Sequence, residues 1–222
     1  MARCQSGRRL SSPVDRRTTA RGELVLRRDG AHFEIVSNGV FLMDTRAGSS
    51  ERLLVSAALD SRALPAHVLI GGLGVGFSLA EALVHPLTLD VTVVEVEPAV
   101  IDWQRTHLAA FSGHALDDPR VRVVCADLLD WLDVKDGRYD VICVDIDNGP
   151  QWTVTDRNAG LYCDTGLARV KKRLAVDGTV AVWSAADDDA FYRRLDAVFG
   201  NARCHFLPVR RGEPDVVFVA GR

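Results

Sequence analysis

Three acidic residues, Glu95, Asp127 and Asp145, each follow a short apolar segment that is typical of a buried strand. The carboxyl ends of parallel strands meet at one edge of an open α/β sheet, so we expect these three carboxylates to lie along that edge. There they can accept hydrogen bonds, and one of them can take a proton from a reacting group. An acid after a strand also often caps a helix, as Asp127 would for Leu128–Leu132.

A glycine-rich turn precedes the first of these acids. The apolar segment His67–Ile70 leads into the turn, and Phe77–Val84 then has the pattern of a helix. Glycine lets the backbone approach a ligand at a helix N-terminus, where free N–H groups favour negative charge. The turn contains Gly71, Gly72, Gly74 and Gly76.

The spacing of the glycines separates two cofactor classes. A dinucleotide site needs G-x-G-x-x-G, and Phe77 or Leu79 stands where its third glycine would be. The observed G-x-G-x-G is typical of domains that bind the nucleoside of S-adenosylmethionine. We therefore expect the four glycines and Glu95 to bind the cofactor, with Glu95 on the ribose hydroxyls. Asp127 would accept from the adenine amino group, and Asp145 would face the reacting group.

Two other readings of the turn remain open. It can be a structural turn of some other α/β protein. In addition, Gly76-Phe77-Ser78-Leu79-Ala80 is one residue away from the G-x-S-x-G nucleophile elbow of α/β-hydrolases. The elbow needs serine on the turn itself, whereas Ser78 falls inside the expected helix.

The segment Ile146–Gly160 has almost no periodic pattern, and a loop of this length is usually functional or disordered. We expect it to close over the cofactor, with Asp147, Gln151 and Trp152 as substrate or lid residues. Asp145 is the candidate base, and Asn148 would orient the acceptor. Asp145 and Asp147 together favour a neutral or cationic acceptor. In the alternative reading, Asp145 only caps the turn and Trp152 packs on the core.

The surrounding elements predict an α/β fold. Residues 65–222 alternate strands with helices and end in an antiparallel pair, which indicates a doubly wound, mostly parallel seven-stranded sheet. Residues 22–64 predict a small antiparallel β-sheet, with hairpin turns at Asp29-Gly30 and Asn38-Gly39, followed by a helix that Ser49 or Ser50 caps. Residues 1–21 carry six arginines and predict a flexible basic tail.

Composition narrows the function classes. The net charge of −3 gives no general attraction to nucleic acid, and no apolar run is long enough to span a membrane. Five scattered cysteines suggest a reducing, cytoplasmic setting, and the six histidines have no metal-ligand spacing, so we expect no metal. The partner we expect is a small-molecule acceptor; a homodimer is compatible with these features.

From about Gly22 to Gly178 the chain resembles the spermidine synthase family of aminopropyltransferases. The resemblance rests on the N-terminal sheet, the Gly71–Gly76 turn, Glu95-Val96-Glu97, Ala126-Asp127, Tyr139–Asp145 and Leu161-Tyr162. It implies a small β-domain on a methyltransferase-like Rossmann domain. It also implies aminopropyl transfer from decarboxylated S-adenosylmethionine to putrescine or a related amine.

The sequence departs from the family where the amine binds. Gly74 replaces the turn's Asp, Asn148-Gly149 replaces a second Asp and a Pro, and Ser50–Ser56 lacks the Tyr and His of D-E-x-x-Y-H-E. An acid in the turn would repel the carboxylate of intact S-adenosylmethionine, and Gly74 removes that repulsion. We therefore expect an enzyme that uses intact S-adenosylmethionine, most simply for methyl transfer to a small nucleophile. The alternatives are an aminopropyltransferase that uses the decarboxylated form and a non-catalytic nucleoside-binding domain.

Overall fold

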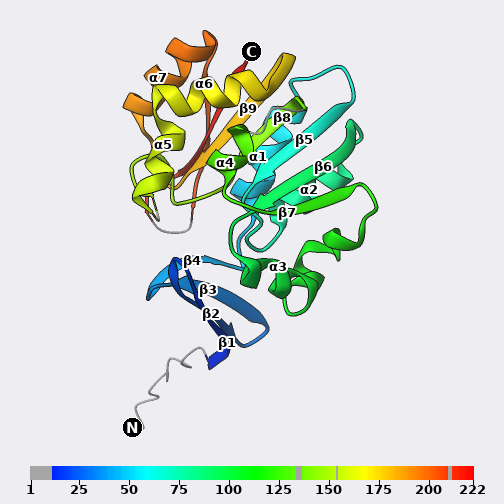
Figure 1. Ribbon diagram of the computed structural model, residues 1–222, viewed down its shortest axis with the longest axis vertical. Coiled ribbons are helices and arrows are strands. Elements are labelled where there is room, and N and C mark those ends of the chain that lie inside the picture. The colour runs from blue at the N-terminus through cyan, green and yellow to red at the C-terminus, as the bar shows by residue number, and fades with distance from the viewer. Residues whose placement is uncertain (1–11, 134–136, 154, 210–211) are drawn as a thin grey trace, which may run out of the picture. The chain divides into compact units, whose positions relative to one another are not determined.

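The computed structural model describes residues 12–133, 137–153, 155–209 and 212–222. It divides into two compact units, Met1–Arg46 and Ala47–Arg222. None of the helices in these ranges combines the length and apolar character that a membrane span requires. Figure 1 shows the elements of both units.

The first unit holds an antiparallel sheet in the order β1-β2-β3-β4. Its strands are β1 (Ser12–Thr19), β2 (Gly22–Asp29), β3 (His32–Ser37) and β4 (Val40–Asp44). The turn between β3 and β4 has positive φ at both Asn38 (49°) and Gly39 (81°), as a type I′ hairpin requires. The last three strands agree with the sequence-based expectation.

The first strand differs from that expectation, because part of the predicted basic tail is ordered. β1 pairs with β2 along its length, and Arg16 forms an ion pair with Glu23 across the two strands. Its side chains are mostly exposed, so the segment has no alternating apolar pattern that would identify a strand. Residues 1–11 of the predicted tail lie outside the described residues.

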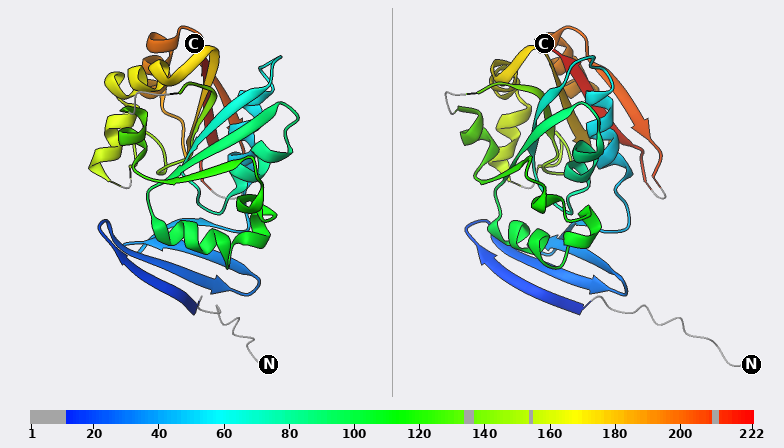
Figure 2. Two further views of the ribbon diagram at one scale, coloured as in Figure 1. Left: turned by 45° about the vertical axis from the view of Figure 1, so that its right-hand side comes forward. Right: turned by 90° about the vertical axis from the view of Figure 1, so that its right-hand side faces the viewer.

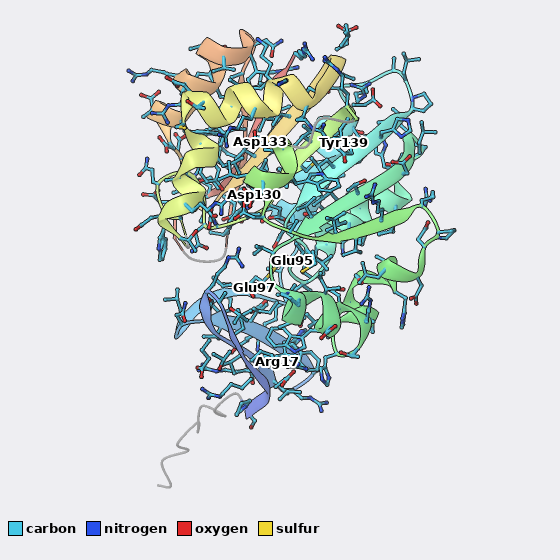
Figure 3. The ribbon with its side chains drawn as sticks, viewed as in Figure 1. Arg17, Glu95, Glu97, Asp130, Asp133 and Tyr139 are labelled. Carbon is cyan, nitrogen blue, oxygen red and sulfur yellow. The ribbon has the colours of Figure 1, made fainter. Side chains whose placement is uncertain are left out.

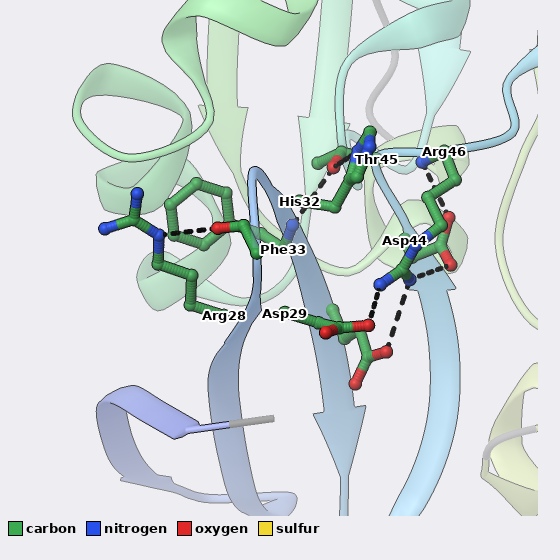
Figure 4. A network of polar contacts seen from close by, with 9 residues as sticks. Arg28, Asp29, His32, Phe33, Asp44, Thr45 and Arg46 are labelled. Atoms are coloured by element: carbon green, nitrogen blue, oxygen red, sulfur yellow. Dashed lines mark hydrogen bonds and ion pairs between the residues drawn. The ribbon is translucent and has the colours of Figure 1, made fainter. Parts of the chain in front are cut away.

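One arginine links three strands in this unit. Arg46, just after β4, pairs with Asp29 of β2, with Glu34 of β3 (3.3 Å) and with Asp44 of β4 (2.7 Å), as the network in Figure 4 illustrates. The carboxylates raise the pKa of the Arg46 guanidinium, the hydrogen bond to Asp44 having the largest effect. Arg46 therefore fixes the exit of the chain from the sheet.

The second unit is built on a sheet in the order β10-β11-β9-β8-β5-β6-β7. β11 runs antiparallel to its two neighbours, and the other pairs are parallel. The predicted doubly wound, seven-stranded sheet is confirmed. The strands are β5 (Ala66–Gly71), β6 (Thr88–Glu95), β7 (Val121–Cys125), β8 (Tyr139–Val144), β9 (Leu174–Ser184), β10 (Arg203–Leu207) and β11 (Asp215–Gly221).

Helices cover both faces of this sheet (Figure 2). The helices α1 and α2 pack together on one face, while α4, α6 and α7 pack on the other around a core that includes Phe191 and Phe218. The α-helices are α1 (Ser49–Leu59), α2 (Phe77–Val84), α3 (Pro98–Arg105), α4 (Leu128–Asp133), α5 (Ala159–Tyr162), α6 (Asp164–Arg173) and α7 (Asp189–Phe199). Short 3-10 turns occur at Ala109–Ser112, Ala115–Asp117 and Asp156–Asn158.

Helix α1 differs from the expectation in two respects. It packs on β9 and β11 and belongs to the second unit, so the boundary falls at Arg46 rather than after residue 64. Its N-cap is Gly48, with no side-chain cap, because the hydroxyl of Ser50 donates to the carboxylate of Glu51 (3.1 Å) inside the helix.

Candidate functional site

The glycine turn connects β5 to α2 with left-handed backbone angles. Gly72, Gly74 and Gly76 have φ of 94°, 46° and 83°. Gly76 is also the N-cap of α2, and its N–H donates to the carbonyl of Leu73 (2.8 Å). The G-x-G-x-G spacing therefore matches three positions where side chains other than glycine are strained.

Glu95, at the end of β6, holds this turn through a hydrogen bond. Its carboxylate accepts from the N–H of Leu73 (2.9 Å) and from the N–H of Glu97 (2.8 Å), and the residue is only 7% exposed. Burial raises the pKa of Glu95, and the backbone hydrogen bonds oppose that rise. Figure 3 labels Glu95 and Glu97 where β6 ends. Each carboxylate oxygen keeps a lone pair with which it can accept from a ribose hydroxyl.

Asp145 follows β8 and is joined to the same turn through its backbone. Its N–H donates to the carbonyl of Gly71 (2.8 Å). A Cβ at position 72 would lie 2.0 Å from the carbonyl oxygen of Asp145, so only glycine allows this approach. The structure thus brings the turn, Glu95 and Asp145 together, as the sequence predicts for the carboxyl ends of neighbouring strands.

The carboxyl group of Asp145 is buried, although the residue as a whole keeps some exposure. Burial raises its pKa to about 6, and a hydrogen bond from the Ser78 hydroxyl (2.5 Å) works against that rise. A carboxyl with a pKa this close to neutrality can take up and release protons under physiological conditions.

A further acid, Glu51, lies in the first turn of α1 and was not among the site residues expected from the sequence. Burial raises its pKa to about 7, with the negative charge of Asp145 as the next contribution and that of Asp215 as a smaller one. Glu51 occupies the Glu position of D-E-x-x-Y-H-E, so this motif was the signal in the sequence that could have found it. The site therefore has a second titratable carboxyl group that the strand ends alone do not reveal.

Asp127 lies beside Glu95 along the edge of the sheet, since the N–H of Ala126 donates to the carbonyl of Glu95 (3.0 Å). One oxygen of Asp127 caps α4 by accepting from the N–H of Leu129 (2.9 Å), and the other is 3.5 Å from Arg157. The capping role is thus observed, and contact with adenine stays a prediction.

The loop after β8 is ordered around Asp147, which adopts a φ of 62°. Its carboxylate accepts from Asn158 (2.8 Å) and lies 3.4 Å from the hydroxyl of Tyr162, which donates to the carbonyl of Ile146 (2.9 Å). These contacts tie the beginning of the loop to α5.

The remaining loop residues have fewer contacts with the core. The backbone of Asn148 bonds to Trp152 (3.2 Å) and Ala185 (3.0 Å), and the role of its side chain in orienting the acceptor stays a prediction. Gln151 is exposed and Trp152 is 63% exposed, so Trp152 does not pack on the core. Residue 154, within the predicted lid, lies outside the described residues. Lid closure and substrate contact stay predictions for this segment.

The fold and this arrangement define a Rossmann-like domain whose ligand edge carries a glycine turn and acids. The family model described as "Spermine/spermidine synthase domain" matches residues 49–190. The chain belongs to this family, which confirms the resemblance found in the sequence.

Curated relatives carry the name polyamine aminopropyltransferase. The protein from Pyrobaculum calidifontis is 30% identical over 156 residues, covering 69% of this chain and 53% of the relative. The protein from Mycobacterium tuberculosis (strain H37Rv) is 30% identical over 190 residues, covering 82% and 35%. This chain therefore spans about half or less of the length of these relatives.

Solved structures of spermidine synthases share the fold. One, in complex with the transition state analogue AdoDATO, superposes with a TM-score of 0.80 at 20% identity, covering 95% of this chain and 73% of the other. The spermidine synthase from Thermotoga maritima has a TM-score of 0.76 at 19% identity, covering 95% and 72%.

These relatives overturn the expectation of methyl transfer, since they are named as aminopropyltransferases. The error lay in judging the charge of the site from Gly74 alone. The fold places Glu51 within electrostatic range of Asp145, so the site keeps two neighbouring carboxyl groups without an acid in the turn.

Proposed function

We propose that this chain is an aminopropyltransferase that uses decarboxylated S-adenosylmethionine and a small cationic amine. The observation that carries the proposal is the position of Asp145, whose backbone is bonded to the glycine turn (2.8 Å) and whose carboxyl has a raised pKa. The membership in the spermine/spermidine synthase family supports it.

Some residues of the site bind the two substrates, and one accepts the proton. The turn and Glu95 hold the nucleoside, and Asp127 lies next to Glu95 for the adenine amino group. Asp145 and Glu51 supply negative charge for a donor and an acceptor that both carry ammonium groups. An acceptor of this charge agrees with the expectation from Asp145 and Asp147.

The reaction requires alignment and one proton acceptor. The lone pair of the acceptor amine attacks the aminopropyl carbon next to the sulfonium. A C–N bond forms as the C–S bond breaks, and both electrons of that bond remain on sulfur, which leaves a neutral thioether. The amine nitrogen loses one proton, and Asp145 accepts it.

The test is to incubate the purified protein with decarboxylated S-adenosylmethionine and putrescine and to measure the aminopropylated amine. The substitution Asp145→Asn should lower turnover by about 10²–10⁴-fold while donor affinity by calorimetry changes little. Asp90→Asn is the matched control, because Asp90 lies near the start of β6 and pairs with His67 (2.6 Å). Absence of transfer by the wild-type protein, or near-normal turnover of Asp145→Asn, would contradict the proposal.

A further inference from the structure

Ser78 has a position that neither the glycine turn nor the strand ends explain. It is the second residue of α2 and is only 3% exposed. Its hydroxyl oxygen lies 2.5 Å from Oδ2 of Asp145 and 3.3 Å from the backbone carbonyl oxygen of Glu51. This hydroxyl therefore faces the base of the proposed reaction, and it is not on the turn as a hydrolase nucleophile would be.

The two neighbours of this hydroxyl are both acceptors, whereas serine has a single hydrogen to donate. When Asp145 is ionised, Ser78 donates to Oδ2 in a charge-assisted hydrogen bond. When Asp145 carries a proton, its own O–H can donate to the Ser78 oxygen. The serine hydrogen then turns to the carbonyl of Glu51.

Rotation of one hydroxyl thus satisfies both protonation states of a buried carboxyl group. No heavy atom has to move, and no buried donor is left without an acceptor, which would otherwise be costly. Glu51 lies in α1, Ser78 lies in α2 and Asp145 directly follows β8, and α1 packs against both α2 and β8.

We propose that Ser78 is a positioning residue whose hydroxyl turns from Asp145 to the Glu51 carbonyl as Asp145 takes up the proton of the acceptor amine. The proposal rests on the aminopropyl transfer inferred above. In this step an N–H bond breaks, its electron pair stays on nitrogen, and an O–H bond forms on Asp145. Ser78 itself gains and loses no atoms.

Other titratable groups also act on this carboxyl group. Glu51 of α1, Cys143 of β8 and Tyr162 of α5 interact electrostatically with Asp145, and Asp215 of β11 acts on Glu51. Burial raises the pKa of Cys143 and of Tyr162, so both stay neutral near pH 7. Glu51 is thus the charged group whose titration accompanies that of Asp145.

The first experiment compares kcat against pH for the wild-type protein and Ser78→Ala. In Ser78→Ala the ionised form of Asp145 loses a hydrogen bond, so the pKa of Asp145 rises. The acidic limb of the kcat profile should therefore move up by about one pH unit. Ser78→Thr keeps the hydroxyl and should restore the wild-type limb. Ser56→Ala is the control, because its hydroxyl lies on α1 and donates to the carbonyl of Leu53 (3.4 Å). A Ser78 that served only packing would change stability and leave the limb in place.

A second measurement does not depend on turnover. The carboxyl carbon of Asp145, followed by NMR in aspartate-labelled protein, should titrate about one unit higher in Ser78→Ala than in the wild type. An unchanged titration midpoint, or an unchanged acidic limb in folded Ser78→Ala, would overturn the role of Ser78. A wild-type protein that binds the donor but transfers nothing would instead refute the proposed function, and the NMR titration would still decide whether Ser78 controls Asp145.

Discussion

Replacing Gly72 with alanine should damage both the stability and the donor site of this protein. The new Cβ would lie 2.0 Å from the carbonyl oxygen of Asp145 and 2.9 Å from its carbonyl carbon, far inside ordinary contact distance. Relief requires a shift of more than an ångström between two backbone segments. The hydrogen bond from Asp145 N–H to Gly71, which now measures 2.8 Å, would be lost in that shift.

The size of the effect follows from three contributions. An alanine with positive φ costs about 1–2 kcal/mol, and the lost hydrogen bond costs about 0.5–1.5 kcal/mol. The collision with a backbone oxygen adds strain of about 1–3 kcal/mol. We therefore expect Gly72→Ala to lower the free energy of unfolding by about 2.5–6.5 kcal/mol.

Gly200→Ala is the matched control for this substitution. Gly200 has a similar φ, 89°, at the end of α7, and a Cβ there would meet nothing within 4 Å. Gly200→Ala should therefore lower the free energy of unfolding only by the cost of an alanine with positive φ, about 1–2 kcal/mol.

Urea unfolding measures both losses, and calorimetry measures the affinity for decarboxylated S-adenosylmethionine. That affinity should fall at least about tenfold in Gly72→Ala and stay unchanged in Gly200→Ala. Equal stability losses in the two variants, with normal donor binding, would refute the reasoning from the Gly72–Asp145 contact.

Three other predictions concern the acids of the site and the turn. Glu95→Gln turns an amide N–H₂ toward a backbone N–H, so the turn loses a hydrogen bond. The affinity for decarboxylated S-adenosylmethionine should fall by about 10–100-fold in calorimetry. An unchanged affinity would place the ribose elsewhere. Burial raises the folded-state pKa of Glu51 to about 7 and that of Asp145 to about 6, so the free energy of unfolding should fall as pH rises from about 4 to 7. In urea unfolding, Glu51→Gln should flatten this pH dependence and raise the free energy of unfolding at pH 8 by on the order of 1–3 kcal/mol. A pH profile equal to that of the wild type would argue against the raised pKa of Glu51. Gly74→Asp occupies a left-handed position (φ 46°) that aspartate tolerates, and it should raise the preference for the decarboxylated over the intact donor by about tenfold, as competition binding would detect.

The order of β1 and the position of α1 both depend on contacts with other elements. The strand β1 has mostly exposed side chains, so its polar sequence predicts a tail, and its order comes from hydrogen bonds to β2. Helix α1 follows the small sheet in the chain, yet it buries Leu54 and Leu59 in the second unit. Neither choice can be made from local periodicity, because β1 depends on pairing with the neighbouring strand and α1 on the surface of distant strands.

The sequence by itself determined the parts of the site that depend on local backbone rules. Glycine spacing specified a turn with three positive φ angles, and the acids that follow buried strands specified Glu95 and Asp145 at one edge, since parallel strands end together. Tertiary structure alone decided that Ser78 of α2 contacts Asp145 and that Glu51 of α1 interacts with it electrostatically. The charge of the site and the protonation of Asp145 depend on these two neighbours, because electrostatic interaction and burial act through space and not along the chain.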